Sequence, residues 1–368
     1  MRSNIKNIVI IKGLKVLRVD KLRQKLIENS LDALIITSSS NIYYLSGFSG
    51  TNAVLFITLK HKILLTDFRY LEQAGKEAAG FDIIRADRDL MAAVFRQAEG
   101  ITKIGIEEES ISWAEYQQMA KLFAGCSLIE ASHILREMRQ VKDQEEIDIL
   151  RQAIRITDEA FRLILDKIKP GVEEEEISLD LEYSLRKMGA SGRSFDYIVA
   201  SGSRSALPHG VASAKKIEKR ELLTLDFGAK YQWYCSDFTR TVFVGRPEAK
   251  HREIYDLVLE AQLAAIDIIK PGLTGKEVDA VARNIISQAG YAEYFGHGLG
   301  HSVGLEIHET PSFNTREEMI LEPGMVITVE PGVYLPGWGG VRIEDVVLVT
   351  NYGVEVLTQA PKQFIILD

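Results

Sequence analysis

A repeat in the C-terminal half of the chain limits its fold more than any other sequence feature. Ile168-Lys169-Pro170-Gly171 recurs as Ile269-Lys270-Pro271-Gly272, an offset of 101 residues (269 − 168), and Gly189 recurs as Gly290. Each copy has the pattern of a helix, a Pro-Gly stop, a second helix and a glycine, followed by two strands. A duplicated unit of this kind predicts two halves related by a pseudo-twofold axis.

Four acids occupy matching places in the two copies. In each copy one acid ends the first predicted strand, as Asp226 and Glu330 do. A second acid, Asp237 or Glu344, lies in or just before the second strand. A pseudo-twofold axis would therefore bring the four carboxylates together. The predicted strands are Leu222–Asp226 and Asp237–Val244 in the first copy, and Val326–Glu330 and Val341–Val349 in the second.

A histidine completes this set of possible metal ligands. His301 ends the glycine-rich run Gly296–His301, in which a helix is disfavoured and which fails the dinucleotide-binding pattern. Oxygen ligands with one nitrogen suit Mn²⁺ or a similar divalent cation. Because four carboxylates exceed what one divalent ion needs, the set predicts a hydrolytic centre with two metal ions.

Three of these acids also have an ordinary structural interpretation. Asp226 precedes Gly228 and could simply form a turn. Asp237 could pair with Arg240, and strand alternation would place Arg342 beside Glu344. His308 could be a hydrogen-bonded structural residue, and Cys235 is interpreted as a small buried residue of a hairpin rather than a soft metal ligand.

The length of 368 residues favours two domains, and the boundary is expected near residues 133–143. Asp143 and Glu146 then form a helix-opening capping box. We predict an α/β layer domain over residues 16–135 and a catalytic domain over 140–362. The first domain is expected to contain helices at Val19–Ser30, Asp67–Ala79, Met91–Ala98 and Ser112–Phe123, and strands at Asp32–Thr37, Ala53–Leu59, Lys62–Thr66, Ile83–Ile84 and Lys103–Ile106.

Composition excludes several classes of function. A net charge of −8 without a long basic stretch argues against a nucleic-acid partner. No run approaches the ~20 apolar residues of a membrane span, and the apolar run Ile8–Ile11 is too short for a signal peptide. Two cysteines far apart, Cys126 and Cys235, fit a reducing compartment. We therefore expect a cytoplasmic protein with no membrane partner.

The motifs together resemble those of the pita-bread-fold metallopeptidases, in the branch that contains Xaa-Pro aminopeptidase and Xaa-Pro dipeptidase (prolidase). The similarity covers about residues 140–360, and the N-terminal part resembles the creatinase/prolidase N-terminal domain through Asn41–Phe48. The fold class implied is an α/β layer domain followed by an α+β pita-bread domain with an internal pseudo-twofold repeat. The matching blocks are Leu225–Gly228, Ser236–Arg240, Gly296–His301, Thr328–Gly332 and Val341–Asp345.

This resemblance implies a role for each candidate residue. Asp226 would bind one metal, Asp237 and Glu344 would bridge two, and His301 and Glu330 would complete the second. Glu330 would also move a proton during the reaction. The remaining residues implied in catalysis or substrate binding are His209, His297, His308 and Arg342.

The implied reaction is hydrolysis of the bond before proline by a hydroxide that two divalent ions activate, with Mn²⁺ favoured and Co²⁺ or Zn²⁺ as alternatives. We expect an Xaa-Pro aminopeptidase acting on proline-containing peptides, with a dipeptidase restricted to Xaa-Pro as the alternative. A non-catalytic binding protein on the same fold is a further alternative, and the intact ligand set argues against it. The resemblance also implies a homodimer.

Overall fold

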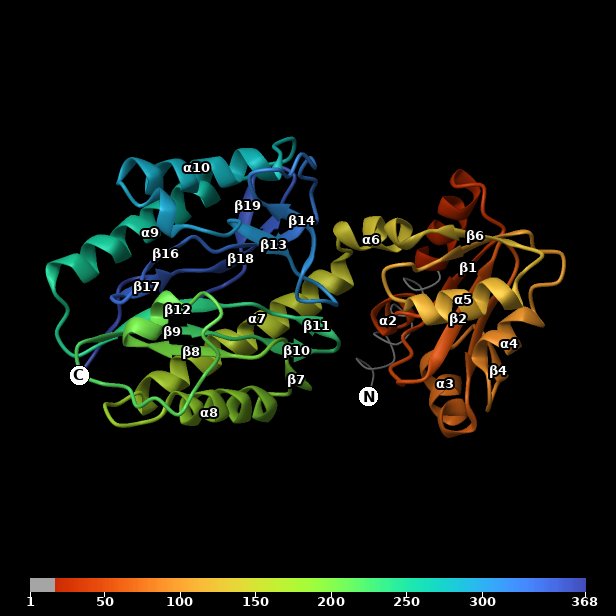
Figure 1. Ribbon diagram of the computed structural model, residues 1–368, viewed down its shortest axis with the longest axis horizontal. Coiled ribbons are helices and arrows are strands. Elements are labelled where there is room, and N and C mark those ends of the chain that lie inside the picture. Colours follow the sequence, from red (N-terminus) through yellow and green to blue (C-terminus); the bar gives the residue numbers. More distant parts are fainter. Residues whose placement is uncertain (1–16) are drawn as a thin grey trace, which may run out of the picture. The chain divides into compact units, whose positions relative to one another are not determined.

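The computed structural model describes residues 17–368, so the apolar run at residues 8–11 lies outside the described residues. The chain divides into two compact units, and the boundary in the sequence lies between Arg139 and Gln140 (Figure 1). Among the described residues, none of the helices combines the length and the apolar character that crossing a bilayer requires. The two units are described separately below.

The N-terminal unit is built on a six-stranded sheet with the order β4-β3-β2-β1-β5-β6. β1 pairs antiparallel with β2, and β2 with β3, whereas the other neighbours are parallel. The strands are β1 Ala33–Ile36, β2 Ala53–Thr58, β3 Lys62–Thr66, β4 Asp82–Arg85, β5 Lys103–Ile106 and β6 Ser127–Glu130. The helices are residues 17–28, α2 Ser39–Ser46, α3 Leu71–Glu77, α4 Leu90–Phe95, α5 Trp113–Leu122 and α6 Ser132–Gln140.

The sequence predicted five of these six strands and missed β6, α2 and α6. α2 has the sequence SSNIYYLS, whose serines and aromatic residues are poor helix formers. Burial of Ile42, Tyr44 and Leu45 stabilises the helix instead. The expected helix over 67–79 begins as a short 3₁₀ turn, Phe68–Tyr70, because the Asp67 side chain accepts a hydrogen bond from the Arg69 amide.

The C-terminal unit confirms the predicted repeat. Its second helices, α8 Glu174–Lys187 and α10 Gly275–Gln288, begin and end at matching positions of the two copies. They follow α7 Gln144–Ile164, which opens with the predicted Asp143 capping box, and α9 Ala249–Ile268. The helices of the two copies lie on opposite sides of the strands (Figure 1).

Backbone details follow the same repeat. The Gly171 amide donates to the Ile217 carbonyl at 2.8 Å, and the Gly272 amide donates to the Leu321 carbonyl at 3.0 Å. The two glycines have φ values of 95° and 93°, in the left-handed region that favours glycine after a helix. Each copy packs its own apolar core, around Phe161 in the first and Val258 in the second.

The strands that carry the acids belong to two sheets with the orders β20-β12-β9-β8 and β14-β13-β15-β18-β19. β9 pairs antiparallel with β12, and β15 pairs antiparallel with β18. The bounds are β8 Ile198–Ser201, β9 Glu221–Asp226, β12 Thr239–Val244, β13 Gly300–Ser302, β14 Glu309–Phe313, β15 Val326–Val329, β18 Asp345–Val349, β19 Val354–Val356 and β20 Ile366–Leu367.

Two details of the predicted strand pairs are wrong, and both concern the connections. A small hairpin replaces the simple turn expected in each copy, so Asp237 lies in a connection just before β12. The expected strand Val341–Val349 is broken at Ile343 and Glu344, because the Glu344 amide donates to the Thr239 carbonyl, 3.1 Å away, rather than to a ladder of either sheet. The inserted hairpins are β10 Ala229–Tyr231 with β11 Tyr234–Cys235, and β16 Gly332–Leu335 with β17 Gly339–Arg342; β10 also pairs with β7 Gly192–Arg193.

Candidate metal centre

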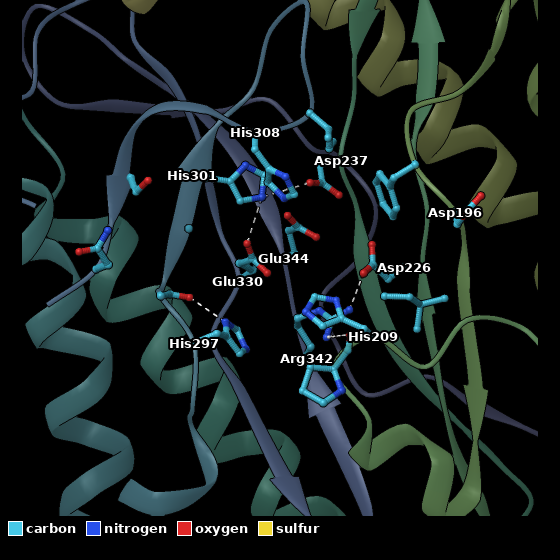
Figure 2. A pocket seen from close by; sticks show the side chains of 18 of the residues that line it. Asp196, His209, Asp226, Asp237, His297, His301, His308, Glu330, Arg342 and Glu344 are labelled. Atoms are coloured by element: carbon cyan, nitrogen blue, oxygen red, sulfur yellow. Dashed lines mark hydrogen bonds and ion pairs between the residues drawn. The ribbon is translucent and has the colours of Figure 1, made fainter. Parts of the chain in front are cut away.

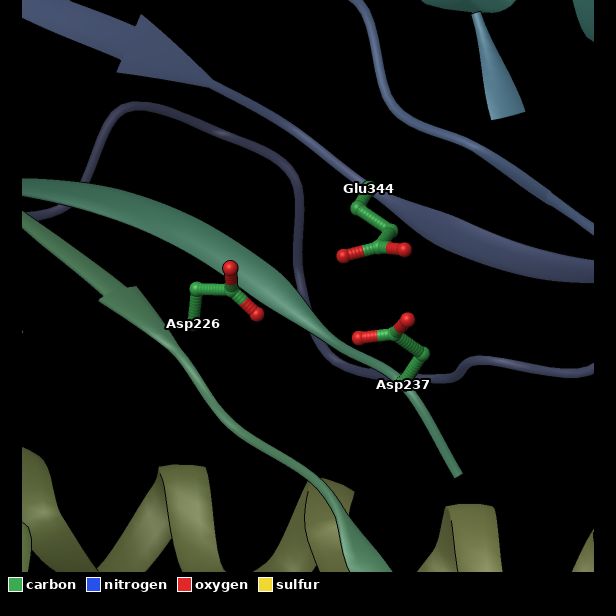
Figure 3. A group of neighbouring side chains, drawn as sticks. All are labelled: Asp226, Asp237 and Glu344. Atoms are coloured by element: carbon green, nitrogen blue, oxygen red, sulfur yellow. The ribbon is translucent and has the colours of Figure 1, made fainter. Parts of the chain in front are cut away.

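Three predicted ligands meet in the interior of the C-terminal unit. Asp226 ends β9, Asp237 precedes β12 and Glu344 precedes β18. Each of the three offers a carboxylate oxygen, and these oxygens lie within 4.8 Å of one another. Figure 3 shows the carboxylates of Asp237 and Glu344 facing each other with Asp226 beside them. The duplicated strand pairs thus bring together acids that are more than a hundred positions apart in the sequence.

A positive charge would stabilise these carboxylates in their surroundings. Burial, together with repulsion from the neighbouring acids, raises the pKa of Asp237 and of Glu344. Asp226 Oδ1 and Glu344 Oε1 are buried without a hydrogen-bond partner. Since unpaired buried carboxylate oxygens are strongly unfavourable, a divalent cation fits this donor set.

His301 and Glu330 extend the acid group on one side. His301 Nε2 lies 3.5 Å from Asp237 Oδ2 and 3.4 Å from Glu330 Oε1. His301 Nδ1 lies 3.2 Å from the Ser302 carbonyl, which can only accept, so in the neutral ring Nδ1 carries the proton. The lone pair of Nε2 then faces two carboxylates, an arrangement that a shared cation stabilises.

Glycine is required beside this histidine. A Cβ atom added to Gly300 would lie 1.9 Å from the Thr328 carbonyl oxygen. The strand that carries His301 can therefore approach β15 only without a side chain at this position. This steric requirement accounts for one glycine of the Gly296–His301 run.

The ordinary ion pairs considered for the sequence do not form. Arg342 Nη2 binds Asp226 Oδ2 at 2.5 Å rather than pairing with Glu344. Arg240 Nη2 binds Asp345 Oδ1 at 2.8 Å rather than pairing with Asp237. Alternation fails for Arg342 and Glu344 because the strand breaks between them. Asp345 pairs with Arg240 and is not a member of the ligand group.

His297 has both ring nitrogens engaged. Its Nδ1 lies 2.7 Å from the Gly298 carbonyl, and its Nε2 lies 2.9 Å from the Tyr334 hydroxyl. Arg342 Nη1 donates to the same hydroxyl at 2.8 Å. Burial lowers the pKa of His297, and burial raises the pKa of Tyr334 to about 12, so the pair is neutral. Tyr334, on β16, was not among the residues predicted from the sequence, although it follows shortly after Glu330.

His209 and His308 lie at the open side of the site. Both are exposed, and the His308 ring packs edge-on against His301 with ring centres 4.4 Å apart. The pKa of His308 is lowered, mainly because part of the ring is buried and to a smaller extent because His301 lies nearby. Figure 2 shows His301 and His308 above Glu330 and Glu344, with Asp226 beside Arg342 and His209.

The five candidate ligands line a cavity of about 550 Å³, together with His209, His297, His308 and Arg342. Part of the lining is apolar, and its residues come from the start of β8, from the loop before it and from the loops near His209 and His308. The size is within the range of small-ligand pockets. The apolar part of the lining consists of Phe195, Ile198, Pro208, Val211 and Ile307.

Cys235 does not join the site. Its thiol lies 3.9 Å from the Leu305 carbonyl, and burial raises the pKa of the thiol to about 12. A thiol with this pKa stays protonated and is a poor metal ligand. The geometry fits the interpretation of Cys235 as a small buried residue.

Fold and site together define a metal-dependent hydrolase built on a duplicated helix-and-strand unit, and comparisons with known proteins specify the class. The pattern of metallopeptidase family M24 matches residues 148–351, and that of the Creatinase/Prolidase N-terminal domain matches residues 18–141. An Xaa-Pro dipeptidase of Pyrococcus horikoshii is 42% identical over 349 residues, which are 95% of this chain and 98% of that protein.

Solved structures agree with this match. An Xaa-Pro dipeptidase from Bacillus anthracis has a TM-score of 0.93 and 47% identity, covering 96% of this chain and 100% of that one. An X-Pro aminopeptidase from Thermotoga maritima has a TM-score of 0.87 and 40% identity, covering 92% and 98%. The chain therefore belongs to metallopeptidase family M24. This confirms the predicted fold class, an N-terminal α/β domain and a pita-bread domain, and the prediction that the chain is an enzyme.

Proposed function

We propose that this protein is an Xaa-Pro dipeptidase (prolidase), which hydrolyses the bond between the first residue and proline. The observation that carries the proposal is the buried acid group with its unpartnered oxygens, in a chain similar along its length to proteins named Xaa-Pro dipeptidase. The aminopeptidase was the first expectation from the sequence, but the relatives support the dipeptidase better.

The five predicted ligands fit two divalent ions. Asp226 would hold one ion, His301 and Glu330 the other, and Asp237 and Glu344 would be shared. Oxygen donors with a single imidazole favour Mn²⁺, with Co²⁺ or Zn²⁺ as alternatives. Bound in this way, divalent ions supply a water of lowered pKa and neutralise charge that develops on the scissile carbonyl.

The protein's own residues would orient the substrate and move protons. Glu330 has 18% of its side chain exposed and faces His301, so it can take a proton from water and return it to the departing proline nitrogen. His209 and His308 lie where they can hydrogen-bond the substrate. Arg342 holds Asp226 in place, and the apolar residues of the lining suit the proline ring.

The second candidate is the Xaa-Pro aminopeptidase, which removes the first residue from longer peptides. The structural similarity to the Thermotoga maritima X-Pro aminopeptidase favours it. Both candidates use the same chemistry and differ in the length of peptide that fits. The homodimer implied by the family resemblance remains a prediction that size-exclusion chromatography can test.

Three peptides assayed with Mn²⁺ separate these functions. We expect hydrolysis of Leu-Pro, little hydrolysis of Leu-Pro-Gly-Gly and none of Leu-Ala. Equal rates on the first two would identify an aminopeptidase. Failure to cleave any peptide in Mn²⁺, Co²⁺ or Zn²⁺ would overturn the proposal and favour a binding protein on the same fold.

A further inference from the structure

A buried hydroxyl links two parts of the candidate metal centre. Thr239, the first residue of β12, is fully buried. Its Oγ1 lies 2.7 Å from Glu344 Oε2 and 3.1 Å from Arg342 Nε. No role follows for this residue from the proposed ligand set, to which it contributes no atom.

The direction of these two hydrogen bonds is fixed by chemistry. A guanidinium group has only donors, so Thr239 Oγ1 accepts from Arg342 Nε. The single hydroxyl proton is then donated to Glu344 Oε2. Glu344 Oε2 is therefore an acceptor for the protein, whereas Glu344 Oε1 is left buried without a partner.

The backbone of Thr239 restrains the same glutamate. The Glu344 amide donates to the Thr239 carbonyl at the break between β17 and β18, where no sheet ladder holds Glu344. Thr239 thus contacts Glu344 through both its main chain and its side chain. Through Arg342, which binds Asp226, the contacts connect acids from both copies of the repeat.

We propose that Thr239 is a positioning residue for Glu344: its hydroxyl holds one carboxylate oxygen so that the other is presented to metal. The inference rests on the proposed function through the metal-binding role of Glu344. Because one oxygen is already fixed, the glutamate side chain loses less conformational freedom when metal binds. Hydrogen-bond partners of metal ligands affect metal affinity strongly.

Substitutions at Thr239 test this role by isothermal titration of the metal-free protein with Mn²⁺. Thr239→Val removes the hydroxyl with little change of shape, and we expect Mn²⁺ affinity to fall about 10–100-fold. Thr239→Ser keeps the hydroxyl and should retain affinity near that of the wild type. Thr239→Ala is a second variant without the hydroxyl, for use if the valine variant does not fold.

Thr224→Val is the matched control. Thr224 is buried on β9, two residues before Asp226, and its hydroxyl lies 3.3 Å from that of Thr241. The control loses a buried threonine hydroxyl that contacts no ligand carboxylate. Urea unfolding of the metal-free variants measures the purely structural effect, and we expect similar losses of stability for Thr239→Val and Thr224→Val but weaker Mn²⁺ binding only for the former.

The outcomes separate this inference from the proposed function. If the wild type binds Mn²⁺ and cleaves Leu-Pro but Thr239→Val binds Mn²⁺ equally well, the positioning role is wrong and the function stands. Equal weakening by Thr224→Val or Thr239→Ser would also overturn the positioning role. A wild type that neither binds Mn²⁺ nor cleaves Leu-Pro would overturn the function itself.

Discussion

The two units each bury carboxylates, but they stabilise them differently. In the N-terminal unit, Glu107 has 2% of its surface exposed. Its oxygens accept hydrogen bonds from the amides of Thr37 and Ser38 at 2.5 and 2.9 Å and from Asn41 Nδ2 at 2.5 Å. In the C-terminal unit, the acids around Asp237 face one another, and two oxygens have no partner.

The difference separates a structural acid from a candidate metal ligand. Burial raises the pKa of both Glu107 and Glu344, so a raised pKa does not distinguish them. What differs is the source of compensation: fixed donors surround Glu107, whereas Glu344 has one donor and several acids near it. Only the second arrangement lacks compensation from the chain itself, and a bound cation would provide it.

Removal of metal should affect only the C-terminal site and gives the largest expected effect. Dialysis against a chelator should abolish peptidase activity, and added Mn²⁺ should restore it. The metal-free protein should also be less stable, by about 2.7 kcal/mol relative to protein with free metal at a hundred times Kd. Activity assays and thermal unfolding with and without Mn²⁺ measure both effects; full activity after exhaustive chelation would contradict the assignment.

Glu344→Gln should separate activity from stability. Because even the outer partners of metal ligands change activity roughly 10–100-fold, loss of a direct ligand should lower kcat/KM by more than ~100-fold. The metal-free variant should nevertheless unfold at higher denaturant than the metal-free wild type, since a buried charge among like charges is gone. Urea unfolding of both proteins without metal tests this reversal.

Glu355→Gln is the control for that variant. Glu355 lies on β19 with 41% of its side chain exposed and pairs with Arg151. It should keep normal activity and show no rise in metal-free stability. Near-normal turnover in Glu344→Gln would rule out its role as a shared ligand.

Much of the architecture was predictable because it follows local patterns. β3 and β5 have the predicted bounds, and the Pro-Gly stops located α8 and α10 through the repeat. Four of the five candidate ligands could be singled out in the sequence because acids at or near strand ends are costly to bury, and the structure places all five candidates in the lining of one pocket.

The features that were missed depend on contacts between distant segments. Thr239 and Glu344 touch although 105 positions separate them, and nothing in the local sequence indicates the contact. The break at Ile343 has the same origin, because the backbone of Glu344 leaves its strand to bind Thr239. Tyr334 was also missed because its partners, His297 and Arg342, come from other strands or loops.

Glu107→Ala should have a smaller effect, confined to stability. The substitution leaves the Thr37 and Ser38 amides and Asn41 without their acceptor, and a buried unsatisfied donor costs about 1–3 kcal/mol. We expect the free energy of unfolding to fall by roughly 3 kcal/mol. Mn²⁺ affinity should not change. Glu109→Ala, at an exposed neighbouring position, is the control for denaturant unfolding and should behave as the wild type.

The smallest expected effect is a pH dependence that Glu107 adds to folding. Burial raises the pKa of Glu107 above its ordinary value of 4.5, so the folded chain holds the proton more tightly than the unfolded chain does. The stabilisation that Glu107 contributes to folding is therefore complete below about pH 4.5 and declines as pH rises toward the folded-state pKa, with a limiting slope of about 1.4 kcal/mol per pH unit.

Glu107→Gln does not titrate, so the unfolding free energy of the wild type minus that of the variant should fall across this window. Because the candidate metal ligands are common to both proteins, their titration cancels in the difference. Urea unfolding of both proteins at a series of pH values gives this difference, and a constant value would show that the hydrogen bonds to Glu107 fully offset its burial.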